Sequence, residues 1–309
     1  MKHFLITGIT LSFLVLFNSF SLNESDKELP DLIREAFTKI TSGKVVIIEE
    51  PEYASGFAIA GTSDTTRMDV SEFYISKYEV TNKEYQEFLK EYRPNASAND
   101  WDNVRIDSSK WMNHVTYATP FVDHYHVHPA YEEYPVVNVS HEGAEAYCQW
   151  LTKKINMQLE NGTSVTLRLP TREEWVRAAR EDEHELKYAW GNEELIDKSG
   201  ELFCNFNIDK KAYNKLLSSQ KKKTKRSVVV GTMDRLQSKV NVTSPVKAYT
   251  PSKNGLYNMN GNVAEMLNVK FVAMGGCWDS SSSEIQIESE MHYIAPSPYI
   301  GFRPVMVFN

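Results

Sequence analysis

The stretch Gly255-Leu256-Tyr257-Asn258-Met259-Asn260-Gly261-Asn262-Val263-Ala264-Glu265 decides the fold of this chain. It combines glycines with asparagine side chains and ends on a carboxylate, which leaves two structures open. Asn260-Gly261 alone is typical of a hairpin turn. Alternatively, a tight glycine-bearing loop can turn backbone carbonyls inward and supply the hard oxygen ligands that calcium prefers. The sequence therefore predicts either a structural turn or a calcium loop here.

Periodicity outside this stretch predicts short strands alternating with amphipathic helices. Thr81 with Glu84, and Thr171 with Glu174, are capping boxes that predict two helix starts, and Ser140 predicts a third. The apolar stripe of the Ser140 helix places Cys148 in the core. The strands are expected at Val45–Ile48, Phe73–Val80, Tyr134–Ser140 and Val165–Pro170. Few helices among short strands and long loops indicate the α+β class.

Several blocks of the chain also occur in an order that resembles the formylglycine-generating, sulfatase-modifying-factor family. The resemblance covers about residues 44–309 and implies that family's fold, a loop-rich variant of the C-type lectin fold. The region around Tyr131 and Pro135 looks most similar to the gliding-motility-associated lipoproteins of this superfamily. The blocks are Tyr78-Glu79-Val80-Thr81-Asn82, Tyr134–Ser140, Arg168-Leu169-Pro170-Thr171, Trp190-Gly191, the stretch 255–265, Gly275-Gly276 and Gly301-Phe302-Arg303.

The chain is expected to divide into a signal, a linker and one domain. Residues 1–21 predict a secretory signal, with a basic start, an apolar run and a small-x-small cleavage site. An uncleaved anchor is the alternative. Residues 22–43 predict a linker and a short helix, and residues 44–309 the family domain, with an exposed, partly disordered insertion at about 208–240. An exported chain without a membrane span after cleavage follows, in the periplasm, at the cell surface or secreted.

The charge and cysteine content of the chain limit the kinds of partner and of fold stabilisation that we expect. The net charge of −7 disfavours nucleic acid, and the basic run 221–226 is expected to be a solvated loop. There are three cysteines, an odd number, so a hydrophobic core rather than disulfides must hold the domain. No cysteine precedes Cys148, which excludes lipoprotein-type acylation after cleavage.

The resemblance implies two calcium sites. The first would use the side chains of Asn258 and Glu265 with the carbonyls of Gly261 and Val263, and calcium would be structural. A second site would use Asn205 and the carbonyl of Phe206. It also needs an aspartate where this chain has Ser238, so the second site is weaker.

A third metal hypothesis comes from the residues alone. His124, His126 and His128 alternate, so they would share one face of an extended segment and could bind zinc or copper. The alternative is a histidine cluster at the surface, because no further ligand is apparent nearby.

The family's two catalytic cysteines, which hold copper(I), fall here on Ser280 and Ile285. A serine hydroxyl is hard and isoleucine has no donor, so a copper site is not expected. Instead, Cys277, Trp278, Asp279 and Ser280 are expected to border a polar ligand pocket, with a solvated loop as the alternative. Arg303 is expected to fix the terminal strand through buried hydrogen bonds.

These observations favour an exported, non-catalytic member of the superfamily. It would act as a binding or structural subunit with a protein partner in the cell envelope, for example in a secretion or gliding machine. Loops at 93–133 and 208–240 are the expected partner surfaces. One alternative is a metal-dependent oxidoreductase of the formylglycine-generating type with an altered site at the histidines or Cys277. Another is a lectin-like ligand binder.

Overall fold

The computed structural model describes residues 31–49, 64–159, 162–180, 185–223 and 242–309. The predicted signal, Ser238 and residues 224–226 of the basic run lie outside these ranges. The helices are α1 (Asp31–Ala36), α2 (Asn82–Tyr92), α3 (Ala98–Val104), α4 (Thr119–His124), α5 (His141–Asn156), α6 (Arg172–Arg180) and α7 (Lys210–Lys223). The strands are β1 (Phe37–Ile40), β2 (Gly43–Glu49), β3 (Asp64–Val70), β4 (Phe73–Ser76), β5 (Val165–Arg168), β6 (Ala264–Met266), β7 (Val272–Met274), β8 (Glu290–His292), β9 (Ile300–Gly301) and β10 (Val305–Phe308).

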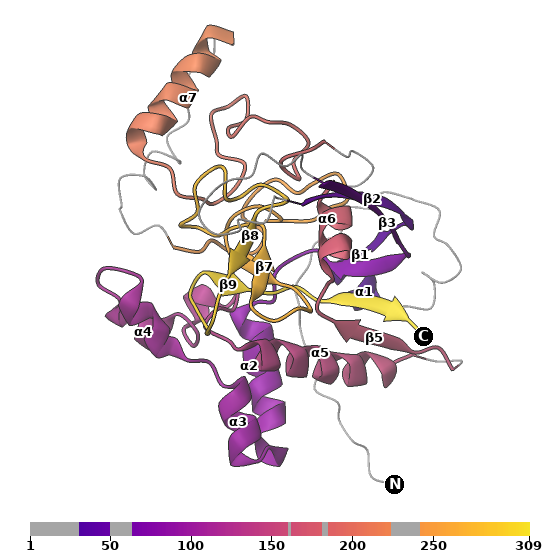
Figure 1. Cartoon of the computed structure of the whole chain (residues 1–309). Helices are drawn as coiled ribbons and strands as arrows, with labels where there is room; N and C mark the ends of the chain where they lie inside the picture. Colours follow the sequence, from indigo (N-terminus) through magenta and orange to yellow (C-terminus); the bar gives the residue numbers. More distant parts are fainter. Residues whose placement is uncertain (1–30, 50–63, 160–161, 181–184, 224–241) are drawn as a thin grey trace.

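Three small sheets form the centre of the domain. One has the order β1-β4-β10-β5 and is antiparallel throughout. In this order the C-terminal strand β10 lies between β4 and β5. The second is the β2-β3 pair, and the third has the order β8-β7-β6-β9, in which β6 and β9 run parallel. Helices α2, α3, α4 and α5 gather at one end of the molecule, and α7 projects from the other (Figure 1). Mixed sheets with separately placed helices confirm the α+β class.

The two predicted capping boxes are present. In α2, the Glu84 backbone N–H donates to Thr81 Oγ1 at 3.2 Å, and the Thr81 N–H donates to Glu84 Oε2 at 2.8 Å. Thr171 and Glu174 exchange the same pair of bonds at the start of α6, and Ser140 caps α5. These starts depend only on neighbouring residues, which is why the sequence predicted them.

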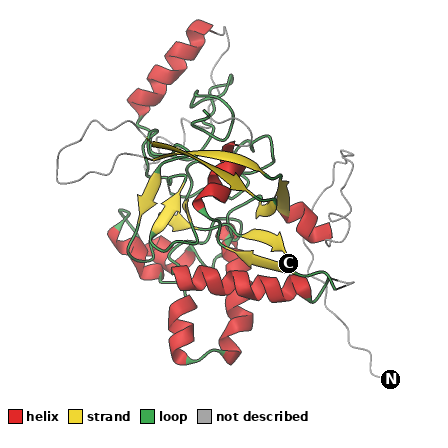
Figure 2. Cartoon of the chain, turned by 45° about the vertical axis from the view of Figure 1, so that its right-hand side comes forward, coloured by secondary structure: helices red, strands yellow, loops and turns green. Residues whose placement is uncertain are grey.

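The core joins the helical end to the sheets. Tyr85 and Phe88 on α2 pack against Tyr147 on α5 and Phe302 beside β9. Cys148 is buried in this cluster as a core residue, as predicted. Figure 2 shows α5 lying across the base of the sheets, with α2 and α3 extending away from it.

Three predictions along the chain were wrong. The expected boundary at residue 44 was wrong: the predicted short helix is present as α1, but it ends at Ala36, and β1 then pairs with β4 inside the domain, which buries Phe37 and Ile40. Residues 134–140 form no strand beyond a single bridge from Pro135 to Thr81. In the described part of the insertion, α7 is a regular helix rather than an irregular segment, because its own Tyr213 and Leu217 form a buried face.

Among the described residues, no helix combines the length and the apolar character that crossing a bilayer requires.

Candidate functional site

The glycine-rich loop leads into β6 through left-handed backbone. Asn258, Gly261 and Asn262 have φ angles of 53°, 73° and 63°. Asparagine tolerates this region better than other residues with side chains. A Cβ on Gly261 would lie 2.3 Å from the Asn205 carbonyl oxygen, so glycine is required there by close approach as well as by φ. The loop is therefore pressed against residues 204–205.

A buried ion pair lies directly under this loop. The Arg303 guanidinium donates to both oxygens of Glu265, with Nε to Oε2 at 2.6 Å, and Trp175 Nε1 donates to Oε2 at 2.7 Å. Arg303 also donates to the carbonyls of Ser76 and Tyr257 at 3.0 and 2.7 Å. Both charged side chains are at most 1% exposed. Arg303 thus ties three segments together, which confirms its predicted role.

A second buried carboxylate adjoins the pair, and sequence reasoning missed it. Glu79 accepts from the side-chain amides of Asn258 at 3.0 Å and Asn262 at 2.8 Å. Burial raises its pKa to about 7, although Arg303 and these amides oppose the shift. We call Glu79, Asn258, Asn262, Glu265 and Arg303 the buried polar cluster. Glu79 stood in one of the resembling blocks, but nothing local showed that it meets residues 179 and 183 positions away.

The expected first calcium site fits this arrangement only in part. Asn258 Oδ1 is buried and has no hydrogen-bond partner, so it could serve as a ligand oxygen. Glu265, in contrast, accepts three hydrogen bonds from Arg303 and Trp175, which leaves about one of its four lone pairs. Arg303 already neutralises that carboxylate. The backbone of Gly261 and Val263 lies in the same loop.

In the weaker calcium site, the Asn205 carbonyl and side-chain amide are engaged by other residues. The Asn205 carbonyl accepts the backbone N–H of Asn262 at 2.8 Å, and its side-chain amide donates to the Val242 carbonyl at 2.7 Å. Phe206 is buried with Tyr188, Cys204 and Ile285. The Ser238 position lies outside the described residues.

The three histidines do not share one face, so that geometric expectation was wrong. His124 ends α4, and the chain turns after it. His126 points inward, with its Nδ1 3.0 Å from Asn82 Oδ1, and burial lowers its pKa to about 3. His128 instead accepts the Ala130 backbone N–H near the surface. Across the part of the chain that the structure describes, no three His, Cys, Asp or Glu side chains are grouped to hold a metal ion.

The positions of the two expected cysteines hold no second thiol. Ser280 Oγ lies 3.5 Å from Cys277 Sγ and 3.1 Å from the Cys277 backbone nitrogen, whose N–H donates to it. Ile285 is fully buried. Burial raises the pKa of Cys277 to about 11, so its thiol is protonated at neutral pH. One thiol beside a hydroxyl and an isoleucine does not fit the two-thiolate copper(I) site that the family resemblance implies.

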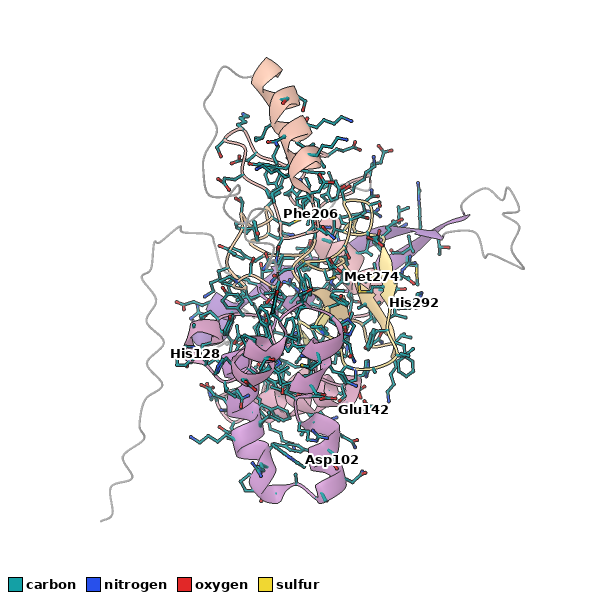
Figure 3. All side chains as sticks on the ribbon, turned by 90° about the vertical axis from the view of Figure 1, so that its left-hand side faces the viewer. Asp102, His128, Glu142, Phe206, Met274 and His292 are labelled. Atoms are coloured by element: carbon teal, nitrogen blue, oxygen red, sulfur yellow. The ribbon has the colours of Figure 1, made fainter. Side chains whose placement is uncertain are left out.

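An open cleft of about 710 Å³ borders the adjacent loop, residues 279–284, which we call the serine loop. Asp279 is the one residue of the predicted pocket that lines it, because Cys277, Trp278 and Ser280 are buried. Phe206, which Figure 3 labels, also lines this cleft. The wall missed by sequence reasoning is α7, although Tyr213, Leu216 and Leu217 have helical spacing. The lining residues are Leu195, Phe206, Asn207, Ile208, Asp209, Ala212, Lys215, Leu216, Ser219, Asp279, Ser281, Ser282 and Glu284.

Carboxylates outnumber cations in this serine-loop cleft. Asp209, Asp279 and Glu284 line it, against Lys215 alone. The pKa of Glu284 is held low because the Ser281 backbone N–H donates to Oε2 at 2.7 Å. Asp279 accepts from the Asn207 amide at 3.1 Å. The cleft therefore presents fixed acidic groups beside the apolar side chains of Leu195 and Leu216.

Comparison with known proteins agrees with this geometry. The model of the family described as "Sulfatase-modifying factor enzyme 1-like domain" matches residues 32–307. The chain belongs to this family. The match begins within α1, so the sulfatase-modifying-factor domain includes β1, which the sequence had placed in a linker.

The relatives include proteins described as inactive and proteins described as enzymes. The chain is 29% identical over 225 residues to the "Inactive C-alpha-formylglycine-generating enzyme 2" of Bos taurus, covering 66% of this chain and 62% of that protein. It is 27% identical over 270 residues to the "Formylglycine-generating enzyme" of Thermomonospora curvata, covering 76% and 74%. The solved structure of "Treponema denticola variable protein 1" superposes with a TM-score of 0.52 at 17% identity, covering 87% and 94%. This last likeness shows the shared fold alone.

Proposed function

We propose that this protein is a non-catalytic sulfatase-modifying-factor domain that binds a partner through the serine-loop cleft. One observation carries the proposal: Ser280 and the buried Ile285 stand at the two expected cysteine positions, with Cys277 as the nearby thiol. Copper(I) binding by this family type needs two thiolates, and these residues supply neither. The likeness to a bovine protein described as inactive supports the same conclusion.

The chemistry of the cleft suggests the kind of partner. Three carboxylates beside one lysine favour a basic segment, and the apolar wall of Leu195, Phe206 and Leu216 favours alternating apolar side chains. The volume is suited to a short peptide segment rather than to a folded domain. We therefore expect a basic, partly apolar segment of a protein partner.

The cellular setting is also a proposal. The apolar start of the chain and the similarity to gliding-motility-associated lipoproteins support export and a role in a cell-envelope assembly such as a secretion or gliding machine. Fractionating the native cell and sequencing the mature N-terminus would test it. A new N-terminus near residue 22 in an exported fraction supports export, and an uncut chain in the cytosol contradicts it.

Structural calcium remains part of the proposal, with Asn258, Glu265 and the carbonyls of Gly261 and Val263 as ligands. The unpartnered Asn258 Oδ1 supports it. Melting temperature should rise with added CaCl₂ and fall with a chelator in the wild type, and the difference should disappear in Asn258→Ala. Magnesium is the control ion. Identical melting curves in calcium and chelator would remove calcium from the description.

Catalysis can be tested directly. The purified chain, incubated with copper(I), oxygen and a cysteine-containing peptide, should leave the peptide's mass unchanged. Titration against a colorimetric copper(I) chelator should show no stoichiometric high-affinity copper. Oxidation of the peptide cysteine that is lost in Cys277→Ser would overturn the non-catalytic proposal.

Partner binding needs its own experiment. A short peptide of alternating lysine and leucine should bind the wild type, measured by calorimetry, at least tenfold more tightly than one of alternating glutamate and leucine. The double variant Asp279→Asn/Glu284→Gln should remove that preference. Glu142→Gln, on the surface of α5, is the matched control. No preference in the wild type, or the same loss in the control, would contradict a cleft-specific site.

A further inference from the structure

A second pocket lies at the other end of the domain. It has a volume of about 430 Å³ and lies among α2, α3 and α4, and it shares no lining residue with the serine-loop cleft. Figure 3 shows the separation, with Asp102 of α3 at one end of the molecule and Phe206 of the cleft toward the other. Any ligand of this pocket is therefore independent of the proposed function.

The charge of this pocket is opposite to that of the whole chain. Lys90, Arg93 and Arg105 line it, and no acidic side chain does, although the chain carries a net charge of −7. We call it the basic pocket. Arg105 pairs through Nε with Asp102 at 2.9 Å. Lys90 and Arg93 have no ion-pair partner within the described residues. His126 also lines the pocket, but burial lowers its pKa to about 3, so it is neutral near pH 7.

The basic pocket has an ordered cationic rim and an apolar interior. The Arg93 guanidinium lies over the Trp101 ring at 4.8 Å from its centroid, which limits its rotation and leaves its N–H groups at the edge. Leu89, Ile106 and Val122 provide apolar surface beside them. A volume of this size is within the range of small-molecule sites.

A purely structural explanation accounts for part of this arrangement. Lys90 is in the last turn of α2 and Arg93 follows it, where positive charge stabilises the helix dipole. That explanation also covers Arg105, which is the C-cap of α3, but it does not account for the apolar surface inside the pocket. Charge placed only for the helix end would not need a cavity.

We propose that the basic pocket binds a small amphipathic anion, with its carboxylate or phosphate at Lys90 and Arg93 and its apolar body against Trp101 and Ile106. The two anionic groups share one chemistry here, since both accept hydrogen bonds from an arginine fork. Binding is non-covalent and is separate from the serine-loop cleft.

Phenylacetate, phenyl phosphate and the neutral phenylacetamide are suitable probes. Calorimetry measures affinity, and the indole N–H signal of Trp101 in a ¹⁵N NMR spectrum, assigned with Trp101→Phe, locates the site. At least one anion should bind tenfold or more tightly than phenylacetamide and move the Trp101 signal. The tighter anion identifies which group the pocket prefers.

Removing the charges of Lys90 and Arg93 tests whether they bind an anion or only stabilise the end of α2. The double variant Lys90→Gln/Arg93→Gln should weaken anion binding at least tenfold at a temperature where circular dichroism shows it folded. Lys44→Gln, an exposed lysine on β2, should bind like the wild type. Equal affinity for anion and amide, an unmoved Trp101 signal, or an unchanged affinity in the double variant would each overturn the proposal.

Discussion

Two polar regions meet at the glycine-rich loop and differ in how their polar groups are satisfied. In the buried polar cluster, Glu79 and Glu265 are bonded by residues from distant parts of the chain. In the serine loop, the exposed side chains bond mainly to near neighbours, as between the Ser281 N–H and Glu284 or between the hydroxyls of Ser281 and Ser283, although Asp279 also accepts from the distant Asn207. The first region fixes the fold, because removing one group leaves another buried without a partner. The second can change its side chains, and so its ligand, at little cost to the fold.

The largest effect is expected at the buried ion pair. Arg303→Met should lower the free energy of unfolding by about 3–5 kcal/mol, because it leaves Glu265 charged, buried and without its main partner. Urea unfolding followed by tryptophan fluorescence measures it. Glu193→Gln, which breaks the exposed pair with Lys187, is the control and should leave the midpoint unchanged. Equal shifts in both variants would erase the contrast between buried and exposed charges.

A comparable effect is expected where the two regions join. Ile285 follows the serine loop but is fully buried against Tyr188, Cys204 and Phe206. Ile285→Ala should cost on the order of 3 kcal/mol through lost burial and a cavity. Ser283→Ala, two positions earlier and exposed, should cost little. If both variants unfold at the same urea concentration, Ile285 is not the core residue that the structure shows.

The sequence predicted what local residues determine. The capping boxes at Thr81 and Thr171 need only neighbours three positions away, and both are present. The expected strand at 134–140 and the one-sided histidine face were wrong, because the alternation of a few side chains does not reveal which segment will pair with them. The helix α7 could have been found from Tyr213 and Leu217, but lysine and serine dominated its composition.

The sequence likewise predicted some residues of the candidate site and missed others. Resemblance located the glycine-rich loop and the missing cysteines, and Arg303 was assigned correctly to the terminal strand. Glu79 was missed because its partners Asn258 and Asn262 are far along the chain. Only Asp279 of the four predicted pocket residues lines the cleft, because sequence position near a loop does not say which side chains point outward.

The buried polar cluster should also make the stability of the fold depend on pH, through Glu79. The pKa of Glu79 is about 7, above the ordinary 4.5, so between these pH values the folded chain holds a proton that the unfolded chain has lost. Its contribution to stability is therefore full below about pH 4.5 and falls as pH rises through about 7, by an amount on the order of 3 kcal/mol. Relative to the wild type, Glu79→Gln should gain stability between pH 5 and pH 8.

Urea unfolding at several pH values measures this difference. Glu142→Gln is the matched control, because Lys270 lowers the pKa of Glu142 and places its titration below this pH range. Its curve should run parallel to that of the wild type from pH 5 to pH 8. A parallel curve for Glu79→Gln as well would mean that Glu79 is not desolvated as the structure shows.

The smallest stability effect should be found in the serine loop, where a substitution should change binding without changing the fold. Glutamine at position 284 keeps a carbonyl oxygen for the Ser281 N–H, so Glu284→Gln should change the free energy of unfolding by less than about 0.5 kcal/mol. The same change removes a negative charge from the serine-loop cleft, and affinity for the lysine–leucine peptide should fall severalfold, more at low salt than at high salt. Arg303→Met does the opposite: it damages stability without altering a residue that lines the cleft. If Glu284→Gln unfolded the protein, or left peptide affinity and its salt dependence unchanged, the serine loop would belong with the fold rather than with recognition.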